Sequence, residues 1–493
     1  MKSVWRSSFL GPIEAALFSP SRWTARVARG ALLVAGGLAA ALLVAALGPI
    51  YAIVGFGAAV GGLLILRDVR WGMAAFCAVI GVLPFAALPF KLGFTPTFLD
   101  LALLALYFVW IMRIATRQQE EVVGTRLGLA VLVFAALAVF AFANGLRYSR
   151  PTATTIRNFV ELLLGILSFF LIVNNFRTSR DHKLVAGLFI LAGAAAAAIA
   201  IIFYVLPPAT TVRILDALSR LNYPGGYGAL RYIEDDPANP MRAIGTMVDP
   251  NVLGGFMILV AGLTAPQVVS PAPFWRRRWL ALILALDLLA LYLTYSRGSL
   301  VGLAAGLLVV GLLRYRKLLL IALIGAGLLM LLPPAQDYVA HFIEGIQLQD
   351  RATLMRLGEY KDALALISRY PWLGVGFAGS PEANLYVGVS NLYLLIAEEM
   401  GVIGVAWFVA TVGLFLGHLW AAWRKARRAA SSHPQREALL LGVGAAVVGV
   451  LVGGIFDHYL FNLVYPHMST TFWMYLGLGM AVAQADDDAC ARR

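Results

Sequence analysis

The chain has 493 residues, of which 60% are apolar and only 13% charged, and its mean hydropathy is +0.80. This composition excludes a soluble globular fold, which has no use for so many uninterrupted apolar runs of helix-spanning length. The runs do not alternate apolar and polar residues, which excludes an outer-membrane β-barrel. The net charge of +13 is interpreted as a bias of cytoplasmic loops toward lysine and arginine, and no nucleic-acid partner is expected.

The apolar runs predict an all-α fold, a polytopic transmembrane helical bundle. A helix crosses the hydrocarbon core with about 20 apolar residues, and the chain repeats such a unit about 14 times. In chain order the predicted spans cover residues 31–48, 50–66, 71–89, 97–115, 127–144, 159–176, 184–206, 252–270, 279–295, 298–313, 317–333, 391–415, 437–456 and 470–485. Gly302 and Gly306 have the small-xxx-small spacing that indicates close helix packing.

These spans divide the chain into regions with different environments. In order they are a basic cytoplasmic N-terminal segment (1–30), N-terminal transmembrane helices (31–206), an extracytoplasmic loop (207–251), central transmembrane helices (252–333), a large, partly helical extracytoplasmic loop (334–390), C-terminal transmembrane helices (391–485) and a cytoplasmic tail (486–493). In the large loop, Asp350 as N-cap and Pro371 as terminator predict one amphipathic helix. Asn251 is expected to cap the span that follows the first loop.

The positive-inside rule assigns a side to each connection. The basic N-terminus and six basic connections, from RDVR at 67–70 to WRKARR at 423–428, are predicted to be cytoplasmic. The outer segments are then 145–158, 207–251, 294–299, 334–390 and 456–469. We therefore expect a multi-pass protein of the bacterial inner membrane with its site facing the periplasm.

The outer segments contain many arginines but only two lysines, Lys91 and Lys361. A guanidinium is a planar fork of donors that binds phosphate oxygens in pairs, whereas an ammonium is a point charge. Arg147, Arg150 and Arg157 lie in a segment without a carboxylate, and Arg297 lies in a minimal turn between two spans. This pattern predicts a phosphate or diphosphate site, and the alternative is that the outer arginines are solvated loop charges paired with nearby acids.

Other polar residues of the outer segments are weaker candidates. Arg356, Glu359 and Tyr360 are spaced to share one helix face, which would orient a lipid-linked substrate. His341, His458 and His467 are each possible general bases. The acids at 234–236 lack the spacing of a calcium loop, so no metal site is expected.

Three sequence motifs, taken in chain order, resemble those of the O-antigen ligase and polymerase superfamily of bacterial membrane glycan-assembling enzymes. The first is Arg242…Gly245…Asp249-Pro250-Asn251, and the second is Ser296-Arg297-Gly298. The third is Arg356-Leu357-x-Glu359-Tyr360-x-x-Ala363-Leu364, followed by Pro371-x-x-Gly374-x-Gly376, Ser390-Asn391-x-Tyr393 and Glu399-x-Gly401. The resemblance covers residues 240–415, while the N-terminal half matches only in hydropathy and span count.

The resemblance implies a metal-independent glycosyltransferase without a cofactor. Its donor would be an undecaprenyl-diphosphate-linked glycan, and its acceptor a lipid A-core or another carrier-linked glycan, as in O-antigen or exopolysaccharide polymerases. The diphosphate-binding candidates are Arg242, Arg297 and Arg356 from the resembling motifs, together with Arg147, Arg150 and Arg157 from the arginine pattern of the outer segments. The implied catalytic residues are Glu359, Ser390, Asn391, Glu399 and His341, and the implied substrate-orienting residues are Tyr360, Asn251 and Tyr393.

One departure from the family leaves the general base open. Many members have His-Asn where this chain has Ser390-Asn391, so Glu359, Glu398, Glu399 or an outer histidine would have to take the histidine's place. The missing histidine favours a polymerase over a ligase. A lipid-linked sugar transporter or flippase and a non-catalytic component of a glycan-export complex are the rival readings, although the chain shows no clear internal repeat of the kind that transporters have.

Overall fold

The computed structural model describes residues 61–89, 94–119, 121–329, 347, 351–382, 385, 387–428 and 434–485, with isolated positions between 23 and 34. The chain forms two compact units, residues 1–71 and 72–493, and the fold below is that of the second. The predicted span 31–48, most of span 50–66, Asp350 and His341 lie outside the described residues.

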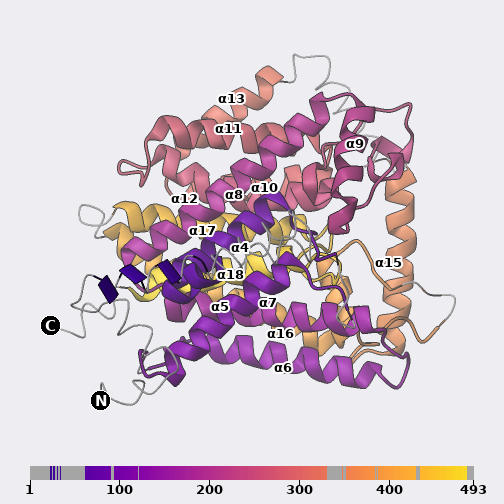
Figure 1. Cartoon of the computed structure of the whole chain (residues 1–493). Helices are drawn as coiled ribbons and strands as arrows, with labels where there is room; N and C mark the ends of the chain where they lie inside the picture. The colour runs from indigo at the N-terminus through magenta and orange to yellow at the C-terminus, as the bar shows by residue number, and fades with distance from the viewer. Residues whose placement is uncertain are drawn as a thin grey trace. The chain divides into compact units, whose positions relative to one another are not determined.

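The described residues confirm the predicted all-α class, with two isolated β-bridges as their only β-structure. The helices, labelled in Figure 1, are α4 (Val69–Val82), α5 (Phe98–Ala115), α6 (Gly128–Gly145), α7 (Ala153–Asn175), α8 (Ser179–Val205), α9 (Pro208–Leu218), α10 (Pro250–Val269), α11 (Arg277–Leu293), α12 (Arg297–Leu313), α13 (Arg316–Leu329), α15 (Arg351–Arg369), α16 (Leu392–Arg428), α17 (Pro434–Gly453) and α18 (Pro466–Gln484). Short 3₁₀ turns fill much of the segment between α9 and α10.

Seven of the described helices are long and apolar enough to cross a membrane: α5, α6, α7, α8, α10, α16 and α17. Two shorter apolar helices, α4 and α12, join them. These lengths match the thickness of a hydrocarbon core, so the chain is a polytopic helical membrane protein. The predicted total of about 14 spans stays a prediction.

Side-chain caps decide where several helices begin. Thr97 and Asp100 form a capping box on α5, and Thr178 and Asp181 form one on α8. Such caps satisfy backbone N–H groups that have no partner inside the helix. Thr152 caps α7, so this helix starts six residues before the predicted span at 159.

The predicted cap of α10 was wrong by two residues. Asp249, not Asn251, is the N-cap: its carboxylate accepts the N–H groups of Asn251 and Val252 at 2.7 and 3.1 Å. Pro250 occupies the first helical position, where its missing N–H costs no hydrogen bond. Asn251 therefore keeps its amide side chain for contacts outside the helix.

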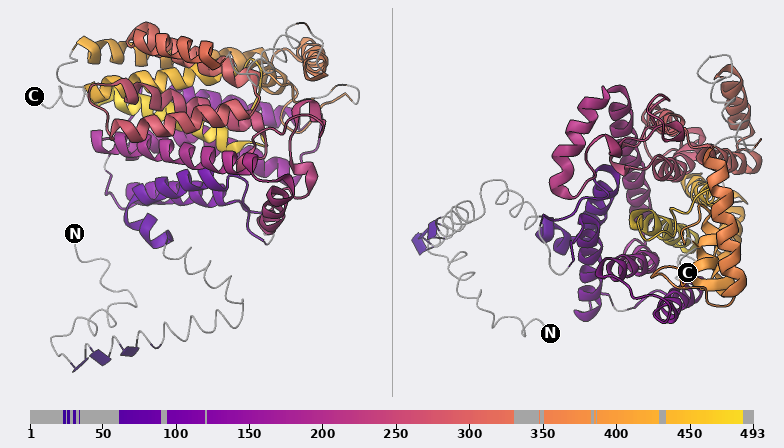
Figure 2. Two further views of the ribbon diagram at one scale, coloured as in Figure 1. Left: turned by 90° about the horizontal axis from the view of Figure 1, so that it is seen from above. Right: turned by 90° about the vertical axis from the view of Figure 1, so that its right-hand side faces the viewer.

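The core of the bundle is built on α10, α17 and α18, whose side chains are mostly buried. Figure 2 shows α18, in yellow, enclosed by the surrounding helices. The glycine spacing in α12 has the predicted packing role, because a Cβ at Gly302 would lie 2.6 Å from the Gly449 carbonyl oxygen of α17. A Cβ at Gly306 would likewise lie 2.8 Å from that of Ala445. Small residues thus bring helix backbones close together where lipid gives no hydrophobic drive for association.

Helix α16 is kinked, unlike the uniform span predicted for 391–415. Gly401 has φ 71° and ψ −176°, a conformation essentially restricted to glycine. The turn after α15 packs into the kink: Val375 and Gly376 donate to the carbonyls of Glu398 and Glu399 at 2.8 and 3.0 Å. These bonds satisfy carbonyls that the interrupted helix leaves without partners.

Helix α15 runs across the ends of the other helices instead of along them, as Figures 1 and 2 show. It ends at Arg369, just before the predicted terminator Pro371. Its outward side exposes Leu354, Met355 and Leu364, each more than half accessible. The helix therefore has one face toward the bundle end and an exposed side on which these apolar side chains lie beside Lys361 and Ser368.

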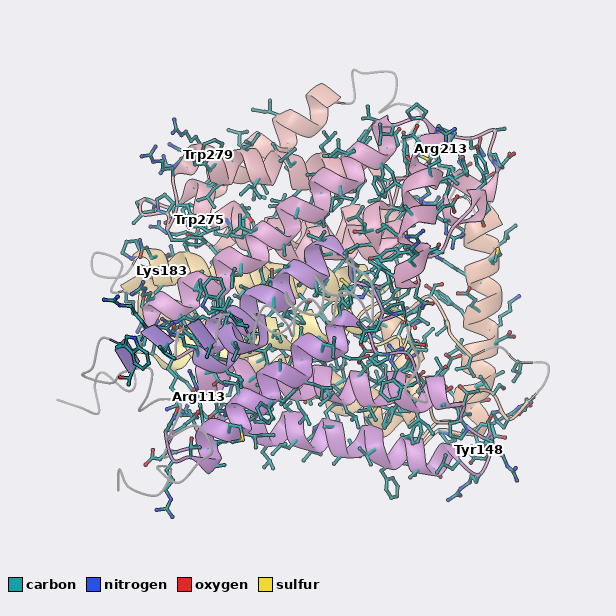
Figure 3. The ribbon with its side chains drawn as sticks, in the orientation of Figure 1. Arg113, Tyr148, Lys183, Arg213, Trp275 and Trp279 are labelled. Atoms are coloured by element: carbon teal, nitrogen blue, oxygen red, sulfur yellow. The ribbon has the colours of Figure 1, made fainter. Side chains whose placement is uncertain are left out.

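The two ends of the bundle carry the segments that the charge pattern separates. Figure 3 shows Arg113, Lys183, Trp275 and Trp279, all from predicted cytoplasmic segments, at one end. Tyr148 and Arg213, from predicted outer segments, lie at the opposite end. We call the latter the outer end, after the predicted side of these segments.

We predict that Gly401→Ala destabilises the protein, whereas Gly413→Ala in the same helix does not. A Cβ at Gly401 would lie 2.2 Å from the Trp372 carbonyl carbon, and the backbone conformation alone costs an alanine about 1–3 kcal/mol. Apart from its own turn of helix, no described residue comes within 4 Å of a Cβ placed at Gly413. Thermal unfolding of both variants in detergent is the measurement, and equal melting temperatures would contradict the role given to the kink.

Candidate active site

An arginine pocket lies at the outer end of the bundle. It is a cavity of about 60 Å³ that draws on all three sequence motifs. It is lined by Ile233, Glu234, Arg242, Asn251, Tyr295, Ser296, Arg297 and Arg356. Three of the six arginines predicted to bind a diphosphate therefore come together, along with one predicted substrate-orienting residue, Asn251.

Arg242 holds the segments around this pocket together. Its Nε donates to the Thr294 carbonyl at the end of α11, and its Nη2 donates to Asn251 Oδ1 at the start of α10, both at 2.8 Å. Its backbone N–H donates to the Arg231 carbonyl at 2.7 Å. One residue thus joins the 207–251 loop to two helix ends.

Arg297 is the first residue of α12 and follows a strained turn. Tyr295 has φ 52°, which is uncommon for a residue other than glycine. The Ser296 and Ser299 hydroxyls are 2.9 Å apart, and a Cβ at Gly254 would lie 2.3 Å from Ser299 Oγ. The turn therefore packs tightly on α10, which fixes where Arg297 enters the pocket.

The charge of the arginine pocket suits an anion. Three arginines and one glutamate line it, which gives a formal net charge of +2. The partial positive charge at the N-terminus of α12 adds to this field. Guanidinium groups at such a site bind phosphate oxygens with charge-assisted hydrogen bonds.

The Arg356-x-x-Glu359-Tyr360 face of α15 meets the Ser390-Asn391 motif directly. Glu359 Oε2 accepts the Ser390 backbone N–H at 2.9 Å. The Tyr360 hydroxyl and the Asn391 amide both donate to the Ile455 carbonyl, at 3.2 and 2.8 Å. The third motif of the sequence is thus one structural unit at the edge of the arginine pocket.

Asn391 and Tyr393 have structural partners within this unit. Asn391 Oδ1 accepts the N–H groups of Tyr393 and Leu394 at 2.9 and 3.0 Å, which caps α16. The Tyr393 hydroxyl donates to the Leu451 carbonyl at 2.9 Å. Asn391 therefore holds α16 against the turn that follows α17, and Tyr393 holds it against α17 itself.

Several predicted residues lie elsewhere. Arg147 and Arg150 are exposed between α6 and α7 and line neither the arginine pocket nor the larger one described next. Glu399 is buried beside the kink of α16 and also lines neither pocket. His341 lies outside the described residues.

A larger pocket of about 320 Å³ also opens among the outer segments. Arg157 lines it and is bound to carboxylates: its Nη2 lies 2.8 Å from Glu161 Oε2 and its Nε 3.6 Å from Asp100 Oδ2. The acid-free stretch 145–158 had indicated that Arg157 lacks such partners, and this was wrong. Glu161 is one turn further along α7, and Asp100 is supplied by α5.

Sequence reasoning missed Asp457, which lines neither pocket but interacts electrostatically with Arg356 of the arginine pocket and Asp249 of the larger one. Burial raises its pKa, and Asp249 acts in the same direction, while His458 and Arg356 lower it. Its carbonyl accepts the Leu392 N–H at 3.0 Å, next to the Ser390-Asn391 motif. The only signal in the sequence is its position directly before His458 in a predicted outer segment.

The outer histidines differ in their surroundings. His467 is buried in α18, with its ring 5.0 Å from that of Phe85. His458 is partly buried, and its backbone N–H donates to Asp457 Oδ1 at 2.7 Å. His458 is only three residues after Ile455, whose carbonyl accepts the Asn391 amide, whereas His467 is further along the chain.

The fold and the pocket define a polytopic helical membrane protein with an arginine-rich site at one end. Residues 280–409 match the sequence profile of a family described as O-antigen ligase. The chain is also 30% identical over 206 residues to an O-antigen ligase of Pseudomonas aeruginosa, in an alignment that covers 39% of this chain and 47% of that relative. Both findings show that this part of the chain is similar to O-antigen ligases. The chain spans about half the length of the curated relative that it matches.

We predict that Arg157→Gln lowers stability and that Arg157→Gln/Glu161→Gln recovers most of the loss. Glu161 is only 1% exposed, and breaking a buried ion pair on one side costs roughly 3–5 kcal/mol because the other charge is left unpaired. Thermal unfolding of the two variants tests this. If Arg157→Gln melted like the wild type but lost glycan product, Arg157 would act as a ligand contact and not as a structural one.

Proposed function

We propose that the protein transfers or polymerises an undecaprenyl-diphosphate-linked glycan at the outer face of the bacterial inner membrane. The observation that carries this proposal is the convergence of Arg242, Arg297 and Arg356 in one pocket at the outer end. The match of residues 280–409 to the O-antigen ligase family supports it, because this stretch contains Arg297, Arg356 and the Ser390-Asn391 motif.

The chemistry of the transfer explains the arginines. The acceptor hydroxyl forms a bond to the anomeric carbon of the donor, and the bond from that carbon to the diphosphate oxygen breaks. Negative charge then grows on the departing diphosphate. A hydrogen-bond donor that is already positioned to stabilise such charge contributes on the order of 10²–10³ in rate. In this proposal the guanidinium groups supply the positive charge that a divalent cation supplies in other enzymes.

The proton of the acceptor hydroxyl also needs a destination. We assign it to Asp457, which lies beside the motif where the family histidine is replaced by Ser390. Asp457 is within electrostatic range of Arg356, which lines the arginine pocket, and of Asp249, which lines the larger pocket. Glu359 is the alternative proton acceptor: its carboxylate accepts the Ser390 N–H, just as that of Asp457 accepts the His458 N–H.

The acceptor distinguishes two versions of this function. A lipid A-core acceptor makes the protein a ligase, which is the activity in the printed name of the Pseudomonas relative. A second carrier-linked glycan makes it a polymerase, the version that the missing histidine favours. A gel of surface glycans from a deletion strain separates them: a ligase deletion removes all long chains from the lipid core, whereas a polymerase deletion leaves single repeats.

We predict that Arg297→Lys and Arg356→Lys each lower glycan product by roughly 10²–10³, because lysine keeps the charge but loses the planar pair of donors. Complementation of the deletion strain, read on the same gel, measures the effect. Arg213→Lys is the matched control, since Arg213 is an exposed arginine of the same end that lines neither pocket. Full product from both pocket variants at wild-type protein levels would refute the proposal.

We predict that Asp457→Asn lowers product by roughly 10²–10⁴, the usual contribution of a positioned proton acceptor. Glu359→Gln is the comparison, since it leaves an amide oxygen able to accept the Ser390 N–H. A large loss from Glu359→Gln together with normal product from Asp457→Asn would transfer the role to Glu359. Melting temperatures of both variants are measured alongside, so that misfolding is recognised.

A further inference from the structure

The larger pocket and the arginine pocket share a wall. Arg231 and Asp249 line the larger pocket, while Arg242 and Asn251, from the same stretch of chain, line the arginine pocket. The Arg231 carbonyl accepts the Arg242 N–H at 2.7 Å. A substrate that reaches across this wall would therefore occupy both cavities.

The charges of the two pockets differ. The larger pocket is lined by Arg157 and Arg231 and by the carboxylates of Glu161 and Asp249, so its formal net charge is zero. The arginine pocket, by contrast, has a net charge of +2. A diphosphate is thus favoured in the arginine pocket, and an uncharged group is favoured in the larger one.

The lining of the larger pocket suits a polyhydroxylated ligand. Asn158, Asn222 and Thr154 line it and offer amide and hydroxyl groups that both donate and accept hydrogen bonds. Phe85 and Tyr465 add aromatic rings, against which the C–H faces of a sugar ring can pack. The volume of about 320 Å³ lies at the lower end of small-molecule sites, roughly 300–1,000 Å³.

Backbone strain supports a ligand-binding role for the shared wall. Val248 lines the larger pocket with φ 61°, an outlier for a β-branched residue. Glu234 and Tyr295, which line the arginine pocket, have φ 57° and 52°. Strain of this kind persists only where the surrounding structure enforces it, and it clusters at functional sites.

We propose that the larger pocket is a saccharide subsite that binds an uncharged sugar ring of a glycan substrate while the arginine pocket holds the diphosphate. This inference rests on the proposed function and names the part of the substrate that the second cavity takes. The wall of residues 231–251 separates the sugar from the phosphate groups.

Photo-crosslinking in cells tests the subsite without a purified substrate. A benzophenone amino acid replaces Asn158 in the larger pocket, Ile233 in the arginine pocket, or Leu129, a control on α6 that is 72% exposed. After irradiation the purified protein is stained for carbohydrate and its adducts are identified by mass spectrometry. We expect sugar-bearing adducts from positions 158 and 233 and none from position 129.

The same experiment in a strain that cannot start lipid-linked glycan synthesis identifies the source of the sugar. Loss of the adduct at position 158 assigns the subsite to the carrier-linked glycan, and its persistence assigns it to the sugars of the lipid acceptor. A sugar-bearing adduct at position 233 with none, or only a phospholipid, at position 158 overturns the subsite and leaves the proposed function standing. Absence of sugar at both positions overturns the proposed function as well.

A filled pocket gives a second test. Thr154→Trp places a large ring in the larger pocket. We expect glycan product to fall roughly tenfold to a hundredfold, which is the usual effect of one steric mismatch between a substrate and its pocket. Ile156→Trp is the control, because Ile156 is exposed on the same helix and does not line the pocket. The adduct at position 233 should persist in Thr154→Trp. Normal product from a normally folded Thr154→Trp would refute the subsite.

Discussion

The hydrogen bonds of Arg242 are the constraint on which the arginine pocket depends. They join the end of α11, the start of α10 and the loop backbone at Arg231, so that elements far apart in the sequence share one wall. An arginine suits this role because its donors are fixed in a plane and reach several acceptors at once. Asn251 can accept one of these bonds only because Asp249 caps α10 in its place.

Packing in the rest of the bundle positions α15 against this wall. Glycine contacts between α12 and α17 set the close packing that carries Arg297, and the kink at Gly401 lets the turn after α15 bind the interrupted helix. Arg356 and Glu359 then approach the bundle end from across it. Precise placement of a site by rigid elements is what transition-state stabilisation by fixed charges requires.

Local patterns predicted most of the fold and part of the site. Apolar runs gave α5, α6 and α10–α12 to within two residues or so at each end, and degenerate motifs in a fixed order led to Arg242, Arg297 and Arg356. Long-range pairings were out of reach, because nothing near Arg157 in the sequence indicates Asp100 of α5. The same holds for Asp457, whose role depends on a turn that packs against Asn391.

The exposed apolar side chains of α15 bear on the depth at which this end of the bundle lies in the membrane. A helix that lies across a bundle and turns Leu354, Met355 and Leu364 outward is stable when that side sinks to the boundary between acyl chains and headgroups. The cavity beneath it then sits at the depth where the phosphates of membrane lipids lie. Under the proposed function, a carrier lipid would present its diphosphate there while its isoprenoid tail stays dissolved in the bilayer.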